Sequence, residues 1–278
     1  MEKKLFAAYS GLVSEGPHFN VEEQTLYWVD VTGGKVLRKK LDTPVDAFEV
    51  YAPGLGKIGA LAFAPEGRLF LFTDHCEIHE VVFGTSDVLK WTLPGHSETR
   101  FNDVYDAGDG VYFCGVAPIR PDIRGELWRF DAKTGDFTCI ESATAGMPNG
   151  MGVSPDGKTF YFVVSDEKKV YAYDFDSAAK TVSAKRVLCE DFEGPGVPDG
   201  MCVNPADGTL FVARWDGHCL EHRSVDGRLL ESIEFPIAKV TSADISGSRL
   251  FVTTANLPFD EKTFAETCAG GVFELSLG

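Results

Sequence analysis

Residues 153–165 read VSPDGKTFYFVVS, a Pro-Asp-Gly turn followed at once by a run of aromatic and β-branched residues that is typical of a β-strand. Five other stretches of the chain have the same shape, with an aromatic residue shortly after the turn. The six stretches are FNVEEQTLYWVD (19–30), FAPEGRLFLFTD (63–74), DAGDGVYFCGV (106–116), VSPDGKTFYFVVS (153–165), VNPADGTLFVAR (203–214) and ISGSRLFVTTA (245–255). Their equivalent aromatic residues, each 40 to 50 residues after the previous one, are Tyr27, Phe70, Tyr112, Tyr161, Phe211 and Phe251.

A repeat of this length with several strands per unit is the signature of a β-propeller. Each aromatic strand is followed by another strand-like segment, such as GKVLRKKLD (34–42). We therefore predict an all-β fold, a six-bladed β-propeller with four-stranded blades around a central channel, in which residues 1–278 form one domain. We expect Lys4–Ser10 to add a strand beside the last unit and to close the ring. The alternative fold is a β-sandwich, which needs no regular repeat.

The composition indicates which cellular compartment and which kinds of binding partner to expect. The 278 residues include 26 Lys and Arg against 42 Asp and Glu, a net charge of −16, which argues against nucleic acid or an anionic membrane surface as the partner. No apolar run approaches the roughly 20 residues of a membrane-spanning helix. The seven cysteines are scattered without a C-x-x-C motif, which predicts reduced thiols and a cytoplasmic protein. The oligomeric state stays open between monomer and dimer.

Polar residues recur at one phase of the repeat, that is, at equivalent positions of different units. The innermost strand of each blade should precede the turn, and counting back from the aromatic residue reaches the same point in four units. Those four positions hold Glu15, Asn102, Asn149 and Asp199. Equivalent positions of different blades converge on the channel mouth, so these side chains should surround one point. Their oxygens are ligands that hard divalent cations take, and two carboxylates would balance a 2+ charge.

Two neighbours of Asn102 are interpreted differently. Arg100 lies two residues before Asn102, so it should share its side of an extended strand and could bind substrate. Asp103 alternates with them and is expected to serve the fold. The alternative for Asn149-Gly150 and Asp199-Gly200 is that they are ordinary turn dipeptides, as Pro155-Asp156-Gly157 is, but their common phase favours a site.

The motifs in order resemble the senescence-marker-protein/gluconolactonase (regucalcin-like) family. They are S-E-G-P, R-x-N-D, N-G before S-P-D-G-K-T, Y-D-F-D, P-D-G before W-D-G, and T-S before L-F-V-T-T-A, and they span Ser14 to about Ala255. The resemblance implies a divalent metal in the channel and hydrolysis of sugar lactones. It implies Glu15, Asn149 and Asp199 as metal ligands, Arg100 and Asn102 as substrate-binding residues, and Asp199 also as the catalytic acid and base. Calcium is the first choice of metal, with zinc, manganese or magnesium as alternatives.

The chain also departs from the family pattern. Phe19 stands where many members have Trp, and F-V-V-S and F-C-G-V replace the usual F-T-D-S-like and G-T-M-like stretches. The segment Ala117–Gly125, where members place a lid over the substrate, contains prolines and arginines here. These departures leave the identity of the lactone open. Trp215, in W-D-G, is the tryptophan expected nearest the channel.

Three other functions fit parts of the same pattern. A phosphotriesterase of the diisopropylfluorophosphatase type would use the same ring of oxygens. A non-catalytic propeller would need no metal, and a calcium-binding regulator would need no turnover. A serine hydrolase is disfavoured because the chain has no G-x-S-x-G motif.

Overall fold

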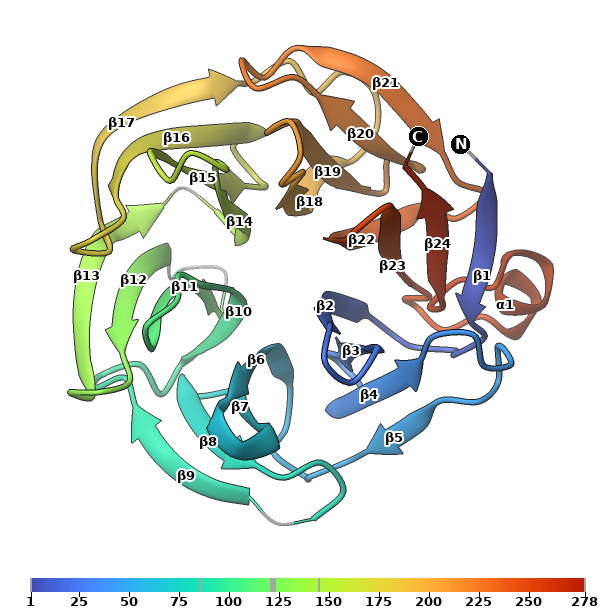
Figure 1. The fold of residues 1–278 in the computed structure, drawn as a ribbon, viewed down its shortest axis with the longest axis horizontal. Coiled ribbons are helices and arrows are strands. Elements are labelled where there is room, and N and C mark those ends of the chain that lie inside the picture. The colour runs from blue at the N-terminus through green and yellow to red at the C-terminus, as the bar shows by residue number, and fades with distance from the viewer. Residues whose placement is uncertain (1, 86, 121–123, 145, 278) are drawn as a thin grey trace.

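Six antiparallel four-stranded sheets follow one another along the chain and stand in a ring in the computed structural model (Figure 1). The structure describes residues 2–85, 87–120, 124–144 and 146–277. In every sheet the first strand of the unit lies nearest the centre of the ring, and the following strands lie progressively further out (Figure 1). The prediction of a six-bladed β-propeller is therefore confirmed.

Five blades are built from consecutive strands paired in chain order. The first blade contains β2 (Ser14–Asn20), β3 (Thr25–Asp30), β4 (Lys35–Lys40) and β5 (Glu49–Tyr51). The second contains β6 (Ile58–Ala64), β7 (Arg68–Thr73), β8 (Glu77–Val81) and β9 (Asp87–Thr92), with a short 3-10 turn, η1 (Pro65–Gly67), between β6 and β7. The third contains β10 (Thr99–Asp106), β11 (Val111–Pro118), β12 (Gly125–Asp131) and β13 (Asp136–Thr144). The fourth contains β14 (Pro148–Val153), β15 (Thr159–Val164), β16 (Lys169–Asp176) and β17 (Thr181–Cys189). The fifth contains β18 (Val197–Val203), β19 (Leu210–Trp215), β20 (Cys219–Arg223) and β21 (Leu229–Glu234).

The sixth blade joins the two ends of the chain. Its strands, from the centre outward, are β22 (Lys239–Ser246), β23 (Arg249–Ala255), β24 (Val272–Ser276) and β1 (Lys3–Ala7). The pairing of β1 with β24 confirms that an N-terminal strand beside the last unit closes the ring, although this strand ends at Ala7. The last sheet therefore ties the two ends of the chain together.

The repeated aromatic residues form the core between the blades. All six lie on the second strand of their blade and are buried. Neighbouring blades meet through such rings: Phe72 of β7 lies 5.5 Å from Phe101 and 5.6 Å from Tyr112, centroid to centroid, on the next blade. Burying one large apolar side chain contributes about 1.5–3 kcal/mol, so the repeat that reveals the fold in the sequence also stabilises it.

One helix interrupts the strand pattern and was not predicted. It is α1 (Glu261–Thr267), in the connection from β23 to β24, and Asp260 caps it by accepting hydrogen bonds from the backbone N–H groups of Lys262 and Thr263. Among the described residues this insertion has no counterpart in the other units, so the repeat could not reveal it. No helix of the described residues is long and apolar enough to cross a membrane.

Candidate active site

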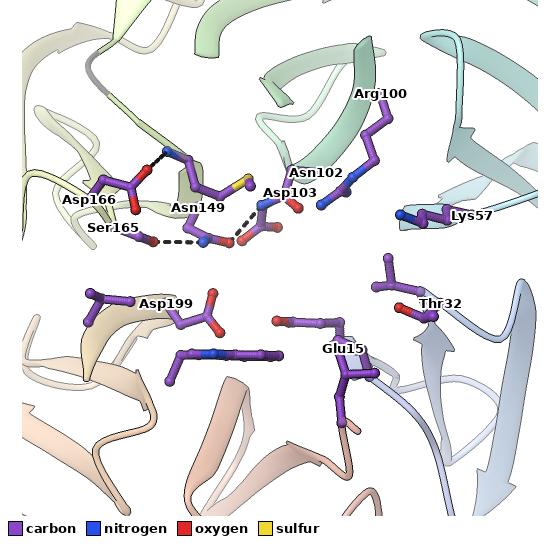
Figure 2. A pocket seen from close by; sticks show the side chains of 16 residues that line it. Glu15, Thr32, Lys57, Arg100, Asn102, Asp103, Asn149, Ser165, Asp166 and Asp199 are labelled. Atoms are coloured by element: carbon purple, nitrogen blue, oxygen red, sulfur yellow. Dashed lines mark hydrogen bonds between the residues drawn. The ribbon is translucent and has the colours of Figure 1, made fainter. Parts of the chain in front are cut away.

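A cavity of about 320 Å³ lies at one end of the central channel (Figure 2). All five residues selected from the sequence line it, although they come from four blades. They are Glu15 on β2, Arg100 and Asn102 on β10, Asn149 on β14 and Asp199 on β18. Asn149 and Asp199 are only 7% and 5% exposed, so these polar groups are presented to the cavity and not to bulk water. The structure thus brings the predicted residues together, while their roles stay predictions.

The inner strands hold these residues at irregular points. In every blade, the pairing of the first strand with the second shifts register close to its first residues. The shifts fall between Glu15 and His18, Ile58 and Ala60, Phe101 and Val104, Pro148 and Met151, Pro198 and Met201, and Val240 and Ser242. A bulge of this kind re-aims side chains that regular alternation would point elsewhere. The polar residues in phase therefore turn toward the channel at equivalent places.

The bulge on β10 corrects the prediction for Asp103. Strict alternation would point Asp103 away from Asn102, but the shift between Phe101 and Val104 lets both side chains line the cavity. Asp103 also lines a second cavity toward the other end of the channel. It therefore lines the site, and no motif in the sequence indicates the bulge that places it there.

Two glycines after the polar residues permit close packing of the inner strands. A Cβ on Gly150 would lie 2.4 Å from the backbone nitrogen of Met201, and one on Gly200 would lie 2.7 Å from the carbonyl oxygen of Thr241. Neither glycine belongs to a turn, since both lie within inner strands. By contrast, Pro155-Asp156-Gly157 forms the turn between β14 and β15, with Gly157 at a φ of +68°. The predicted distinction between the two kinds of motif is confirmed.

A chain of amide hydrogen bonds fixes two of the side chains (Figure 2). Asn102 donates from Nδ2 to the carbonyl oxygen of Pro148 (2.7 Å) and to Oδ1 of Asn149 (2.8 Å). Asn149 in turn donates from Nδ2 to Oγ of Ser165, at 2.8 Å. The Asn149 oxygen keeps a free lone pair, and its direction is set by these partners. Ser165 ends the unusual F-V-V-S stretch, and its contact with Asn149 was not predicted from the sequence.

Negative charge is crowded in the cavity. Burial, followed by the nearby carboxylates of Asp199 and Asp103, holds the pKa of Glu15 well above its usual range, against weaker opposing effects of the Gly16 N–H and Arg100. The pKa of Asp199 is raised by burial and then by Asp103, and Arg100 again opposes the shift. Burial raises the pKa of Asp103 to about 6. By formal charge, the four carboxylates that line the cavity (Glu15, Asp103, Asp166 and Asp199) exceed its two cations (Lys57 and Arg100) by two.

Further residues complete the wall of the cavity. They include Thr32, Lys57, Asp166, Leu257 and Trp215, the tryptophan expected near the channel. Arg100 donates from one terminal nitrogen to the carbonyl oxygen of Phe101, at 3.0 Å. Burial lowers the pKa of Arg100, and the carboxylates of Asp74 and Glu15 oppose that shift.

The predicted lid falls partly outside what the structure describes. Within Ala117–Gly125, Ala117 and Pro118 end strand β11 and Gly125 begins β12, so the connection is shorter than expected. Residues 121–123 lie outside the described residues. The lid therefore stays a prediction.

The donor set fits a hard divalent cation. Glu15 and Asp199 offer carboxylate oxygens, and Asn149 offers an oriented amide oxygen, all of the type that calcium, magnesium and manganese take. The described residues contain no group of three or more His, Cys, Asp or Glu side chains that could hold a metal. The candidate set has only two carboxylates from that list, since its third donor is an amide.

Residues 13–256 match the family described as the SMP-30/Gluconolactonase/LRE-like region. The chain belongs to this family. The match begins just before Glu15 and ends just after the last aromatic strand, so it includes all five predicted site residues. The resemblance drawn from the motifs is thereby confirmed.

Individual relatives can be aligned with most of this chain. Pentonolactonase XacC of Haloferax volcanii is 36% identical over 87% of this chain and 81% of its own. Regucalcin of Xenopus laevis is 29% identical over 95% of this chain and 90% of its own. Among solved structures, the calcium-binding protein regucalcin of Agrobacterium tumefaciens superposes with a TM-score of 0.87 over 98% of this chain and 92% of its own, at 22% identity. At this level of identity, the similarity to the Agrobacterium structure shows the fold alone.

Proposed function

We propose that the protein is a divalent-metal-dependent lactonase that opens sugar aldonolactones to aldonic acids. The observation that carries this proposal is the meeting of Glu15, Asn149 and Asp199 in one cavity, beside Arg100 and Asn102. Its support from relatives is the pentonolactonase, which is 36% identical. The family description, which includes gluconolactonase, supports the same substrate class.

Glu15, Asn149 and Asp199 would hold the cation. When bound, a divalent cation would polarise the lactone carbonyl and stabilise the negative charge that develops on its oxygen. Two uncompensated negative charges in the cavity favour an ion of charge 2+. An all-oxygen donor set makes calcium the first choice, with magnesium, manganese and zinc to be compared.

The chain's own residues would move the proton and hold the sugar. Hydrolysis adds water across the ring ester: the water oxygen bonds to the carbonyl carbon, and the bond to the ring oxygen breaks. Asp199 would take a proton from the attacking water and return it to the departing ring oxygen. Arg100 and Asn102 would orient the sugar hydroxyls, because both line the cavity and Asn102 is fixed by its bond to Asn149.

A panel of lactones tests this function. Gluconic, xylonic, arabinonic and galactonic lactones are assayed by acid release after chelation of the full-length protein, and again after each metal is added back. We expect hydrolysis that disappears on chelation and returns with one or more divalent ions. A protein that opens no lactone with any metal would remove the proposal.

Two other outcomes identify the alternative functions. Turnover of an organophosphate but not of lactones would indicate a phosphotriesterase on the same site. Calcium binding without turnover of either substrate class would indicate a regulator.

We also propose a cytoplasmic location. All seven cysteines are free thiols in the structure, and four of them are buried. This arrangement suits a reducing compartment.

A further inference from the structure

Two cationic side chains point into the cavity from the same side. Lys57 directly precedes β6 and Arg100 lies on β10, in the next blade. Figure 2 shows both reaching toward the centre of the cavity, across from Asp199. Lys57 could not be predicted from the repeat, because the position in this blade that corresponds to Glu15 is the next residue, Ile58, which is fully buried.

The backbone that carries the two cations is anchored by one residue. The N–H of Lys57 donates to Oδ2 of Asp74 at 2.9 Å, and the N–H of Asp74 donates to the carbonyl oxygen of Lys57 at 3.1 Å. Asp74 also forms an isolated antiparallel bridge with Arg100. The segment that carries Lys57 is thus held beside Arg100, and the ammonium is not on a free loop.

Neither cation has a close counter-ion. Among the residues that the structure describes, no carboxylate lies within ion-pair distance of the Lys57 ammonium or of the Arg100 guanidinium, and the only hydrogen bond that Arg100 donates from its side chain goes to a backbone carbonyl. The carboxylates of Asp74 and Glu15 act on Arg100 only from beyond ion-pair distance, so direct charged contacts of both cations stay open to a bound molecule, and neutral hydroxyl groups do not supply them. A carboxylate or phosphate on the bound molecule would supply them.

From this arrangement we infer that Lys57, with Arg100, selects lactones that carry an anionic group on the carbon chain remote from the ring ester. This inference rests on the proposed lactonase function and names the substrate class within it. The carboxylate made by ring opening arises at the ester carbon, beside Asp199. The side of the cavity lined by Lys57 therefore stays available for a second anionic group.

Three sugar acids that differ only at C6 test the inference. Gluconate has a hydroxyl there, glucarate a carboxylate and 6-phosphogluconate a phosphate, and calorimetry measures the Kd of each for the full chain. We expect at least one of the two C6 anions to bind about ten-fold more tightly than gluconate, and the difference to shrink at high salt. Tighter binding of glucarate alone would identify a carboxylate as the group recognised. Tighter binding of 6-phosphogluconate alone would identify a phosphate.

Variants assign the preference to Lys57. In Lys57→Met the difference in Kd should fall below about three-fold, and in Lys57→Arg most of it should remain, because the charge is kept. Lys158→Met is the matched control: it removes the same charge from an exposed turn between β14 and β15, and the preference should persist. Equal Kd values for the three acids, no binding of any of them, or a preference that survives in Lys57→Met would overturn the inference. Because binding is the readout, this result is separate from whether lactones are hydrolysed.

Discussion

Asp199 and Asp156 are both the middle residue of a Pro-Asp-Gly tripeptide, but the fold gives them opposite surroundings. Asp199 is 5% exposed in the cavity, whereas Asp156 lies in an exposed turn and accepts a hydrogen bond from Ser154. Burial raises the pKa of Asp199, while the hydrogen bond from Ser154 lowers that of Asp156. The same three letters therefore yield a candidate catalytic group in one place and a turn in the other.

This pair provides a matched test of the catalytic assignment. Asp199→Asn should lower kcat by about a thousand-fold or more, because the amide cannot accept the proton of the water. Asp156→Asn should leave kcat close to that of the wild-type protein. Steady-state kinetics on a lactone, with circular dichroism to verify folding, would detect the difference. An Asp199→Asn protein that is folded and still active would refute the role of Asp199.

Asp244 allows a prediction of pH dependence away from the proposed metal ligands. It lies on β22 and lines the second cavity, where its Oδ2 accepts a hydrogen bond from the N–H of Phe19 at 2.9 Å. Burial raises its pKa from 3.8 to about 6, and the hydrogen bonds from Phe19 and Ile245 only partly oppose this. Between these pH values the folded state holds a proton that the unfolded state has lost, so the contribution of Asp244 to stability falls as the pH rises.

Asp244→Asn removes this titration. Relative to the wild-type protein, the variant should gain up to about 3 kcal/mol of unfolding free energy between pH 4 and pH 7. Denaturant unfolding of both proteins at the two pH values measures this gain. Comparing the two proteins cancels the contribution of His18, whose pKa is lowered to about 4 by burial and whose effect on stability has the opposite sign. A stability difference that does not change with pH would contradict the prediction.

Some of the site residues on and near the inner strands could be predicted from the sequence, and others could not. Glu15, Asn149 and Asp199 could be found because the aromatic residue of the second strand fixes the phase of the first, and the hairpin between them varies little in length. The orientation of Asp103 could not be predicted from the sequence, since it depends on a bulge that no residue type indicates. Lys57 lies before its strand and outside the phase, and Ser165 acts from the end of a second strand, so neither position is marked by the repeat.

Close packing of the inner strands gives a prediction for Gly200. In Gly200→Ala the new Cβ would lie 2.5 Å from the Cβ of Ser242 and 2.7 Å from a backbone oxygen, so β18 and β22 must move apart. We expect a loss of about 2–4 kcal/mol of unfolding free energy, together with reduced activity, because Asp199 is the preceding residue. Gly247→Ala, in the β22–β23 turn, is the control: it has open space around it and a φ of +60°, so it should lose only about 1 kcal/mol. Equal losses in the two variants, measured by denaturant unfolding, would argue against the packing explanation.

The complete ring depends on a strand from the far end of the chain. The pairing of β1 with β24 completes the sixth blade, and Phe6 of β1 packs against Phe251 with ring centroids 5.1 Å apart. The chain thus forms six sheets, and only the last sheet contains strands from both ends of the chain. The net charge of −16 is mostly a property of the outer surface, since few of its carboxylates line the cavity.

Removal of residues 1–8 should therefore weaken the entire ring. The deletion exposes the edge of β24 and the apolar surface under Phe6, so we expect a Tm lower by several degrees and association through the free edge. Differential scanning calorimetry and size-exclusion chromatography would detect the two effects. A truncated protein with the Tm and elution volume of the full chain would show that the closing strand is dispensable.

A divalent cation held by Glu15, Asn149 and Asp199 is proposed to be required for lactone opening. The most direct test of this requirement is the rate of hydrolysis of one lactone as calcium is titrated into chelated protein. We expect a rate near that of the uncatalysed reaction without metal, saturation as the site fills, and a half-saturating concentration raised by about 100-fold or more in Glu15→Gln. Full turnover by the chelated protein, or an identical titration curve for Glu15→Gln, would contradict it.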